Sequence, residues 1–113
     1  MFKAKYSIQD RIFESNRITT KYPTRVPVIC ERSSRSEGPL LDKNKYLVPN
    51  DLSLRQFMFV IRKRLKLLPE QAIFLFIQNK VPQTSQLLSE AYEENKDIDG
   101  FLYITYSFEN TFG

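Results

Sequence analysis

The chain has 113 residues and a mass of 13.4 kDa; 42% of the residues are hydrophobic, 27% are charged, and the formal net charge is +4. These values fit one globular domain of ordinary composition and exclude disorder along the whole chain. Histidine is absent and cysteine occurs once. This excludes a Ser-His-Asp or Cys-His nucleophile, a Cys-His zinc site and an internal disulfide, so we expect neither an enzyme nor a cofactor.

The first half of the chain is predicted to form two short helices and two strands. Apolar residues recur at loosely helical spacing within residues 1–21. Residues 25–32 are rich in β-branched side chains and predict a strand, in which Pro27 must lie at the start or face a gap in pairing. Turn residues in 33–44 lead to a short strand over 45–49, whose lysines and closing proline are typical of a sheet edge. Alternation places Val26, Val28 and Cys30 on one side of the first strand.

Residues 53–66 are predicted to form the best-defined helix. Ser53 is suited to cap its N-terminus, and Gln56 follows three residues later, which is the arrangement of a capping box. Pro69 is expected to end it. The apolar face at helical spacing comprises Leu54, Met58, Ile61 and Leu65.

The remaining elements complete a recognisable order. The apolar run 74–77 predicts a buried strand, 79–86 a polar connection, 87–95 a short helix and 101–106 a last strand. The predicted order is two helices, two strands, a helix, a strand, a helix and a strand. This is the order of a β-grasp domain preceded by helices. Neither a repeat nor a long linker divides the chain.

A second apolar stripe on the predicted helix 53–66 allows two interpretations. Phe57, Val60 and Arg64 lie to one side of the first face. They either widen the core or border an exposed groove beside the strand 45–49. An edge strand, apolar pockets and a cationic rim together suit an extended acidic peptide that adds as a further strand.

Charge is unevenly distributed. Residues 1–66 carry 15 of the 17 basic and 6 of the 13 acidic residues, a net charge of +9, whereas residues 67–113 carry 2 basic and 7 acidic residues, a net charge of −5. The basic cluster comprises Lys43, Lys45, Arg62, Lys63, Arg64 and Lys66, and the acidic cluster comprises Glu90, Glu93, Glu94, Asp97 and Asp99. We interpret the acidic cluster as a solvated helix face. The basic cluster is either another such face or a docking surface for an acidic peptide, nucleic acid or anionic lipid.

Two single residues allow a functional and a structural interpretation. Cys30 has no histidine partner and lies among apolar residues, so we interpret it as a small core residue. Gly113 is either merely the last residue of the sequence or a conjugation terminus, since an extended tail ending without a side chain can enter a narrow enzyme channel. No apolar stretch approaches the roughly 20 residues that span a bilayer, so we expect a cytoplasmic protein.

Four segments carry a family resemblance. They are residues 21–29 (KYPTRVPVI), 45–49 (KYLVP), 56–64 with Gln-Phe followed by Ile-Arg-Lys-Arg, and 100–103 (GFLY). In this order and at this spacing they resemble the GABARAP-like family of autophagy ubiquitin-like modifiers over essentially the whole chain.

The resemblance implies an α+β fold, a ubiquitin-like β-grasp with two additional N-terminal helices. Residues 1–113 would form a single ubiquitin-like domain, with a helical extension over 1–21, a β-grasp core over 22–108 and a conjugation tail over 109–113. It also implies that an E1-like enzyme activates Gly113 and that an E2-like enzyme carries it as a thioester and transfers it to phosphatidylethanolamine. The lipid would hold the protein on autophagosome or vesicle membranes, and a deconjugating cysteine protease would remove it.

The family binds cargo receptors and adaptors through short aromatic-x-x-aliphatic motifs, often preceded by acids. By resemblance, the pocket for the aromatic residue is lined by Glu14, Ile18, Pro27, Lys45, Leu47 and Phe101. The pocket for the aliphatic residue is lined by Tyr22, Val48, Pro49, Leu52, Phe57 and Val60. Arg25, Lys43 and Arg64 would meet the acids. The resemblance thus favours the groove over the wide core.

The sequence departs from the family pattern in two respects, and two other functions are considered. Many family members carry residues after the glycine, which are removed, whereas this sequence ends at Gly113. The N-terminus is shorter and less basic than in some relatives, so no tubulin binding or membrane tethering is expected of it. One rival is an unlipidated intracellular-transport adaptor or scaffold that uses the same groove. Nucleic-acid binding is the other, and we expect no such partner because no aromatic platform alternates with the basic residues.

Overall fold

The predicted order of helices and strands is confirmed. The structure is a computed structural model, and its described residues are 1–109. The elements are α1 (Phe2–Lys5), α2 (Ile8–Lys21), β1 (Arg25–Arg32), β2 (Lys45–Pro49), α3 (Leu54–Leu65), β3 (Phe74–Phe76), α4 (Leu88–Asn95) and β4 (Leu102–Ser107). Their bounds lie within a residue or two of those expected. Of the predicted conjugation tail, residues 110–113 lie outside the described residues.

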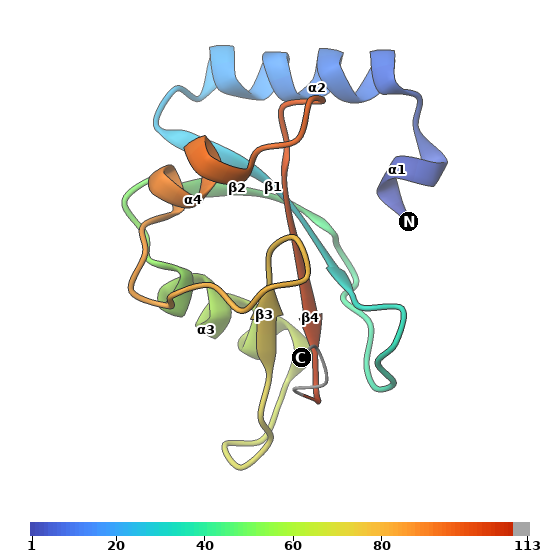
Figure 1. The fold of residues 1–113 in the computed structure, drawn as a ribbon, viewed down its shortest axis with the longest axis vertical. Coiled ribbons are helices and arrows are strands. Elements are labelled where there is room, and N and C mark those ends of the chain that lie inside the picture. The colour runs from blue at the N-terminus through green and yellow to red at the C-terminus, as the bar shows by residue number, and fades with distance from the viewer. Residues whose placement is uncertain (110–113) are drawn as a thin grey trace.

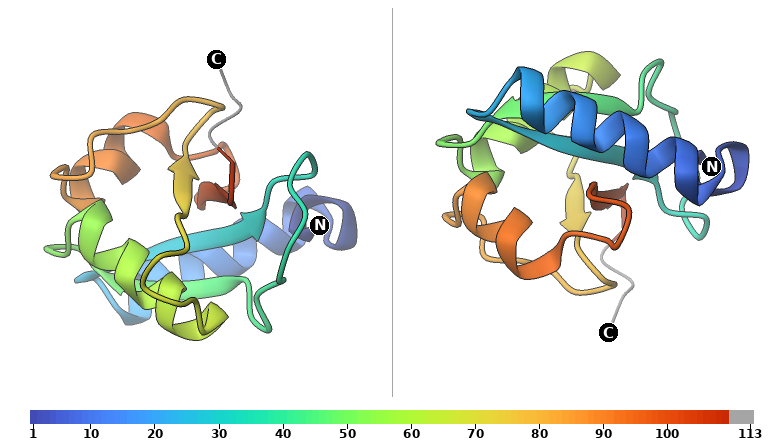
Figure 2. Two further views of the ribbon diagram at one scale, coloured as in Figure 1. Left: turned by 90° about the horizontal axis from the view of Figure 1, so that it is seen from below. Right: turned by 90° about the horizontal axis from the view of Figure 1, so that it is seen from above.

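The four strands form one mixed sheet, in the spatial order β2-β1-β4-β3. The central pair β1 and β4 is parallel, and both outer strands pair antiparallel with their neighbours. Helix α2 lies across one face of the sheet, over β1, while α3 and α4 lie on the opposite side (Figures 1 and 2). The fold is therefore α+β, with the two N-terminal helices added to one face of a β-grasp sheet.

Strand β1 is apolar along most of its length because both of its faces are covered. Val26, Val28 and Cys30 belong to the main core with α3 and α4, as the alternation predicts. Ile29 points the other way, into a second cluster that Phe2 of α1 joins. Burial on two faces explains why this strand reads as a continuous apolar run.

Pro27 occupies a position where the sheet needs no amide from it. The backbone N–H of Cys30 donates to the carbonyl of Asn44 at 2.8 Å, which makes that pair a hydrogen-bonded one. Hydrogen-bonded and non-hydrogen-bonded pairs alternate along an antiparallel ladder. Pro27 is three positions from Cys30, so Pro27 and Leu47 form a non-hydrogen-bonded pair. On the other side, pairing with β4 begins only at Val28. The predicted gap in pairing is confirmed.

Helix α3 begins as predicted, and three of the four residues of its predicted apolar face, Leu54, Ile61 and Leu65, are buried. The Ser53 hydroxyl accepts from the Gln56 N–H at 3.1 Å, and the Gln56 side chain accepts from the Ser53 N–H at 2.8 Å, which confirms the capping box. The buried residues are Leu54, Phe57, Ile61 and Leu65. The assignment of Met58 to the buried face is wrong: Met58 is only half-buried, and Phe57 fills the core instead.

Helix α2 is held to the sheet by a buried carboxylate. The Arg11 guanidinium and the Tyr103 hydroxyl donate to the Asp99 carboxylate at 2.7 and 2.5 Å, and the Phe101 N–H donates to it at 2.9 Å. Because the Asp99 side chain has no exposed surface, its reading as part of a solvated helix face is wrong. It follows α4 in the chain and joins α2 to the loop before β4.

Candidate functional site

The free edge of β2 is the main feature of the candidate site. Since Leu47 is in a non-bonded pair with β1, its N–H and carbonyl point away from the sheet, and those of Lys45 do the same. The Arg25 guanidinium donates to the Leu47 carbonyl at 3.0 Å. One acceptor of the edge is thereby occupied by a side chain that an incoming strand can displace.

On the α2 side of β2, the structure brings the residues of the predicted first pocket together in a closed form. Ile18 and Phe101 have no exposed surface and belong to the second cluster, against which Leu47 packs. Pro27 is also buried, whereas Lys45 and Glu14 are half-buried and form an ion pair at the surface. The apolar floor of this pocket is therefore present but covered.

The Glu14 carboxylate is held by two cations. The Arg17 guanidinium donates to it at 2.6 Å, and the Lys45 ammonium donates to its other oxygen. The hydrogen bond from Arg17, followed by that from Lys45, lowers the pKa of Glu14 from its ordinary 4.5 to about 2. The carboxylate is thus charged at every pH at which the protein is expected to work, and it holds the ammonium group of Lys45, another residue of the predicted first pocket.

We expect this carboxylate to give the protein an acid-sensitive stability. A carboxyl whose pKa is lower in the folded state stabilises the fold above the unfolded pKa, near 4.5, and this contribution is lost as the pH falls toward about 2. Urea unfolding of the wild type and Glu14→Gln, measured between about pH 2 and pH 7, checks this. The difference in unfolding free energy is expected to be largest at neutral pH and to vanish at the acid end. A difference independent of pH would contradict the assignment.

On the α3 side, the predicted second pocket divides into core and surface. Val48 and Phe57 are buried in the main core, Phe57 with 1% of its surface exposed. Tyr22 and Val60 are exposed, and Pro49 and Leu52 are half-buried. The second stripe of α3 is therefore neither entirely core nor entirely groove, because Phe57 belongs to the core and Val60 to the surface.

The predicted cations flank the free edge. Arg64 pairs with the Asp42 carboxylate at 3.1 Å, and its guanidinium lies 5.8 Å from the centre of the Tyr46 ring. The Lys43 ammonium lies 5.2 Å from the centre of the same ring. Both cations thus stand on the α3 face of β2, and Arg25 stands at its edge.

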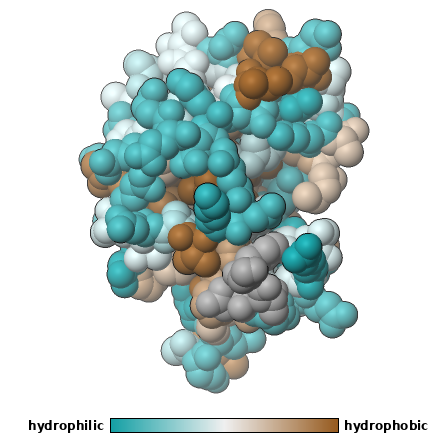
Figure 3. Space-filling view, viewed as in Figure 1, coloured by the Kyte–Doolittle hydropathy of each residue, from teal (hydrophilic) through white to brown (hydrophobic). Residues whose placement is uncertain are grey.

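A cavity beside the first pocket was not predicted from the sequence. It measures about 320 Å³ and is lined by Phe2, Tyr6, Asp10, Arg11, Phe13, Glu14 and Lys45. Phe13 is 72% exposed, and Ile12 beside it is exposed too. Figure 3 shows hydrophobic side chains gathered on the surface of α2, at the top of the view. The helical spacing of residues 1–21 gave no sign of this cavity, because it forms where α1 folds back against α2.

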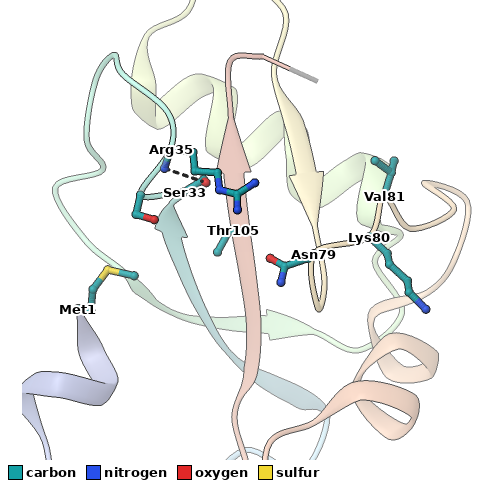
Figure 4. A pocket seen from close by; sticks show the side chains of 8 residues that line it. Met1, Ser33, Arg35, Asn79, Lys80, Val81 and Thr105 are labelled. Atoms are coloured by element: carbon teal, nitrogen blue, oxygen red, sulfur yellow. Dashed lines mark hydrogen bonds between the residues drawn. The ribbon is translucent and has the colours of Figure 1, made fainter. Parts of the chain in front are cut away.

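A larger cavity, of about 680 Å³, contains none of the predicted site residues (Figure 4). Its lining consists of Met1, Ser33, Ser34, Arg35, Asn79, Lys80, Val81 and Thr105. The hydrogen bond drawn in Figure 4 runs from the Arg35 N–H to the Ser33 hydroxyl, at 3.3 Å. Arg35 and Lys80 come from separate loops, and the Lys80 side chain points away from Arg35. The two cations of this cavity do not converge on one point.

Two further features bear on function. Cys30 is fully buried, and burial raises the pKa of its thiol, which confirms that it is a core residue. None of the helices within residues 1–109 has the length and apolar composition required to cross a bilayer.

Comparison with known proteins identifies the family. The family model described as "Autophagy protein Atg8 ubiquitin like" matches residues 10–113. Autophagy-related protein 8 of Mycosarcoma maydis is 56% identical over 112 residues, which cover 99% of this chain and 95% of the relative. The protein of the same name from Schizosaccharomyces pombe is 58% identical, again over 112 residues, covering 99% and 93%.

Solved structures agree with the sequences. Trypanosoma brucei ATG8 superposes with a TM-score of 0.90 at 37% identity, covering 94% of this chain and 91% of that one. Plasmodium falciparum Atg8, solved in complex with a Plasmodium falciparum Atg3 peptide, gives a TM-score of 0.88 at 37% identity and covers 96% of both chains. The chain belongs to the Atg8 family of ubiquitin-like autophagy proteins.

Proposed function

We propose that this protein is a modifier that is conjugated through Gly113 to phosphatidylethanolamine and then recruits cargo receptors and adaptors to autophagosome membranes. The observation that carries the proposal is the free edge of β2, flanked by apolar side chains and cations, in a chain of the Atg8 family. The protein would be cytoplasmic before conjugation and membrane-bound afterwards.

The conjugation half of the proposal is supported by the extent of the family match, which reaches residue 113. An E1-like enzyme would activate the glycine carboxylate, an E2-like enzyme would carry it, and a cysteine protease would release it from the lipid. The Atg3 peptide bound to Plasmodium falciparum Atg8 supports a conjugation enzyme among the partners of this chain.

The recruitment half follows from the arrangement around β2. A peptide that adds to the free edge gains main-chain hydrogen bonds from Lys45 and Leu47. Its aromatic residue would enter the first pocket, where Ile18 and Phe101 are buried, after displacing the half-buried Lys45–Glu14 pair. This pocket lies toward the start of β2.

The aliphatic residue of the motif would lie at the other end of β2. There it would contact Pro49, Leu52 and Val60, which retain exposed surface. Because the first pocket lies toward the start of β2 and the aromatic residue precedes the aliphatic one, the bound peptide runs parallel to β2. Acids that precede the aromatic residue would meet Lys43 and Arg64.

Intact-mass measurement tests the conjugation half. The purified chain is incubated with ATP, species-matched E1-like and E2-like enzymes and phosphatidylethanolamine liposomes. A gain equal to the mass of the lipid minus water is expected. No gain, with enzymes proven active on a control substrate, would overturn lipidation and favour an unlipidated adaptor that uses the same groove.

For the groove, we expect Leu47→Ala to weaken the binding of an aromatic-x-x-aliphatic peptide by about 1–3 kcal/mol, since the substitution removes apolar contact from the first pocket. Isothermal titration calorimetry measures the loss. Val81→Ala is a matched control, because Val81 is an exposed aliphatic residue that lines neither predicted pocket. Wild-type affinity in Leu47→Ala would count against the groove.

A further inference from the structure

We propose that the groove of this protein reads a third side chain of the peptide, an apolar residue two positions before the aromatic one, which inserts into the cavity between α1, α2 and Lys45. The inference rests on the proposed function and adds a specificity to it. The preferred ligand would have the pattern apolar–acid–aromatic–x–x–aliphatic.

The cavity has the size and the walls for such a side chain. Its volume of about 320 Å³ is bordered by three aromatic residues, Phe2, Tyr6 and Phe13. The Phe2 and Tyr6 rings pack with their centres 5.0 Å apart, while Phe13 is largely exposed. Solvent thus reaches aromatic surface that an inserted apolar side chain would cover.

The position of the cavity relative to β2 fixes which peptide residue reaches it. Lys45 and Leu47 are two residues apart, so their side chains lie on the same face of β2. Leu47 contacts the second cluster beneath the first pocket, and Lys45 lines the cavity. In a strand parallel to β2, the residue two positions before the aromatic one lies on this face, about 6.7 Å nearer the start of β2. It therefore comes to lie over the cavity.

The residue between these two side chains faces the opposite way. Tyr46 is on the α3 face of β2, where Lys43 and Arg64 both approach its ring. An acid directly before the aromatic residue would meet these two cations. The alternation of the added strand thus separates an acidic position from an apolar one.

The charges around the cavity disfavour an acid at the apolar position. Arg11 is paired with the buried Asp99 at 2.7 Å. Asp10 and Glu14 both line the cavity, and the Glu14 carboxylate remains there after the aromatic residue has displaced Lys45 from it. A carboxylate placed in the cavity would therefore meet two like charges beside the one cation, Lys45, that this displacement frees.

Three synthetic peptides test the inference by calorimetry. They share one acid-aromatic-x-x-aliphatic core and carry leucine, alanine or aspartate two positions before the aromatic residue. We expect the leucine peptide to bind about five- to tenfold more tightly than the alanine peptide, and the aspartate peptide more weakly than either. Equal affinities for leucine and alanine, with a core that binds, would overturn this inference and leave the proposed groove standing. Failure of all three peptides to bind would overturn both.

Two variants locate the effect. Phe13→Ser is expected to abolish the advantage of leucine over alanine while leaving the affinity for the alanine peptide unchanged, and the exposure of Phe13 means that the fold should tolerate the change. Ile12→Ser removes a neighbouring exposed aliphatic side chain that does not line the cavity, so it should preserve the advantage. An advantage that persists in Phe13→Ser would overturn the assignment.

Discussion

Phe57→Ala is expected to lower the free energy of unfolding by about 3–5 kcal/mol, because it leaves a cavity in the main core. The Phe57 ring has 1% of its surface exposed and packs edge-on against the Tyr46 ring, with 5.8 Å between the ring centres. Tyr46 in turn carries the two cations on the α3 face of β2. Urea unfolding followed by circular dichroism measures the loss.

Val60→Ala tests the expected difference in stability between a core residue and a surface residue of α3. Val60 is 38% exposed, so its truncation is expected to cost less than about 1 kcal/mol of stability. If Phe57→Ala instead kept wild-type stability while peptide binding was lost, Phe57 would have to be a groove residue that the peptide reaches directly. In the structure Phe57 is buried and packs against Tyr46 of β2, so we expect it to support the proposed groove from within.

The contrast between these two residues shows where sequence reasoning succeeds. The capping box of α3 depends on two residues three apart, and the alternation of Val26, Val28 and Cys30 depends only on strand geometry. Pro27 likewise constrains its own backbone amide, so its place in the sheet followed from its chemistry. Features that are set within a few residues could therefore be predicted.

Features set by tertiary packing could not be predicted. Met58 and Phe57 are adjacent apolar residues, and helical period alone does not determine which of them faces the sheet. Asp99 lies in an acidic stretch, and its burial depends on Arg11, which comes from α2, 88 residues earlier in the chain. The cavity at Phe13 depends on the angle between α1 and α2, for which the sequence has no periodic signal. The family resemblance supplied the expected set of groove residues but not which of them are buried.

The second large effect is expected at the other end of the chain, where deletion of Gly113 should abolish conjugation. In the proposed reaction the terminal carboxylate attacks ATP to form an acyl-adenylate and release pyrophosphate. A cysteine thiolate then displaces AMP, and the lipid amine finally displaces the thiolate to form an amide. Without Gly113 the carboxylate belongs to Phe112, whose side chain would have to pass through a channel suited to glycine.

The expected result is no lipid mass gain for the deleted chain, together with an unchanged midpoint of thermal unfolding. Gly113→Ala keeps the length of the tail but adds one methyl group at its end, so it should be conjugated more slowly than the wild type rather than not at all. This variant shows whether conjugation depends on the position of the terminal carboxylate or on the absence of a side chain at the last residue. A full lipid mass gain in the chain that lacks Gly113 would show that the bond forms elsewhere, and the conjugation half of the proposal would then be wrong.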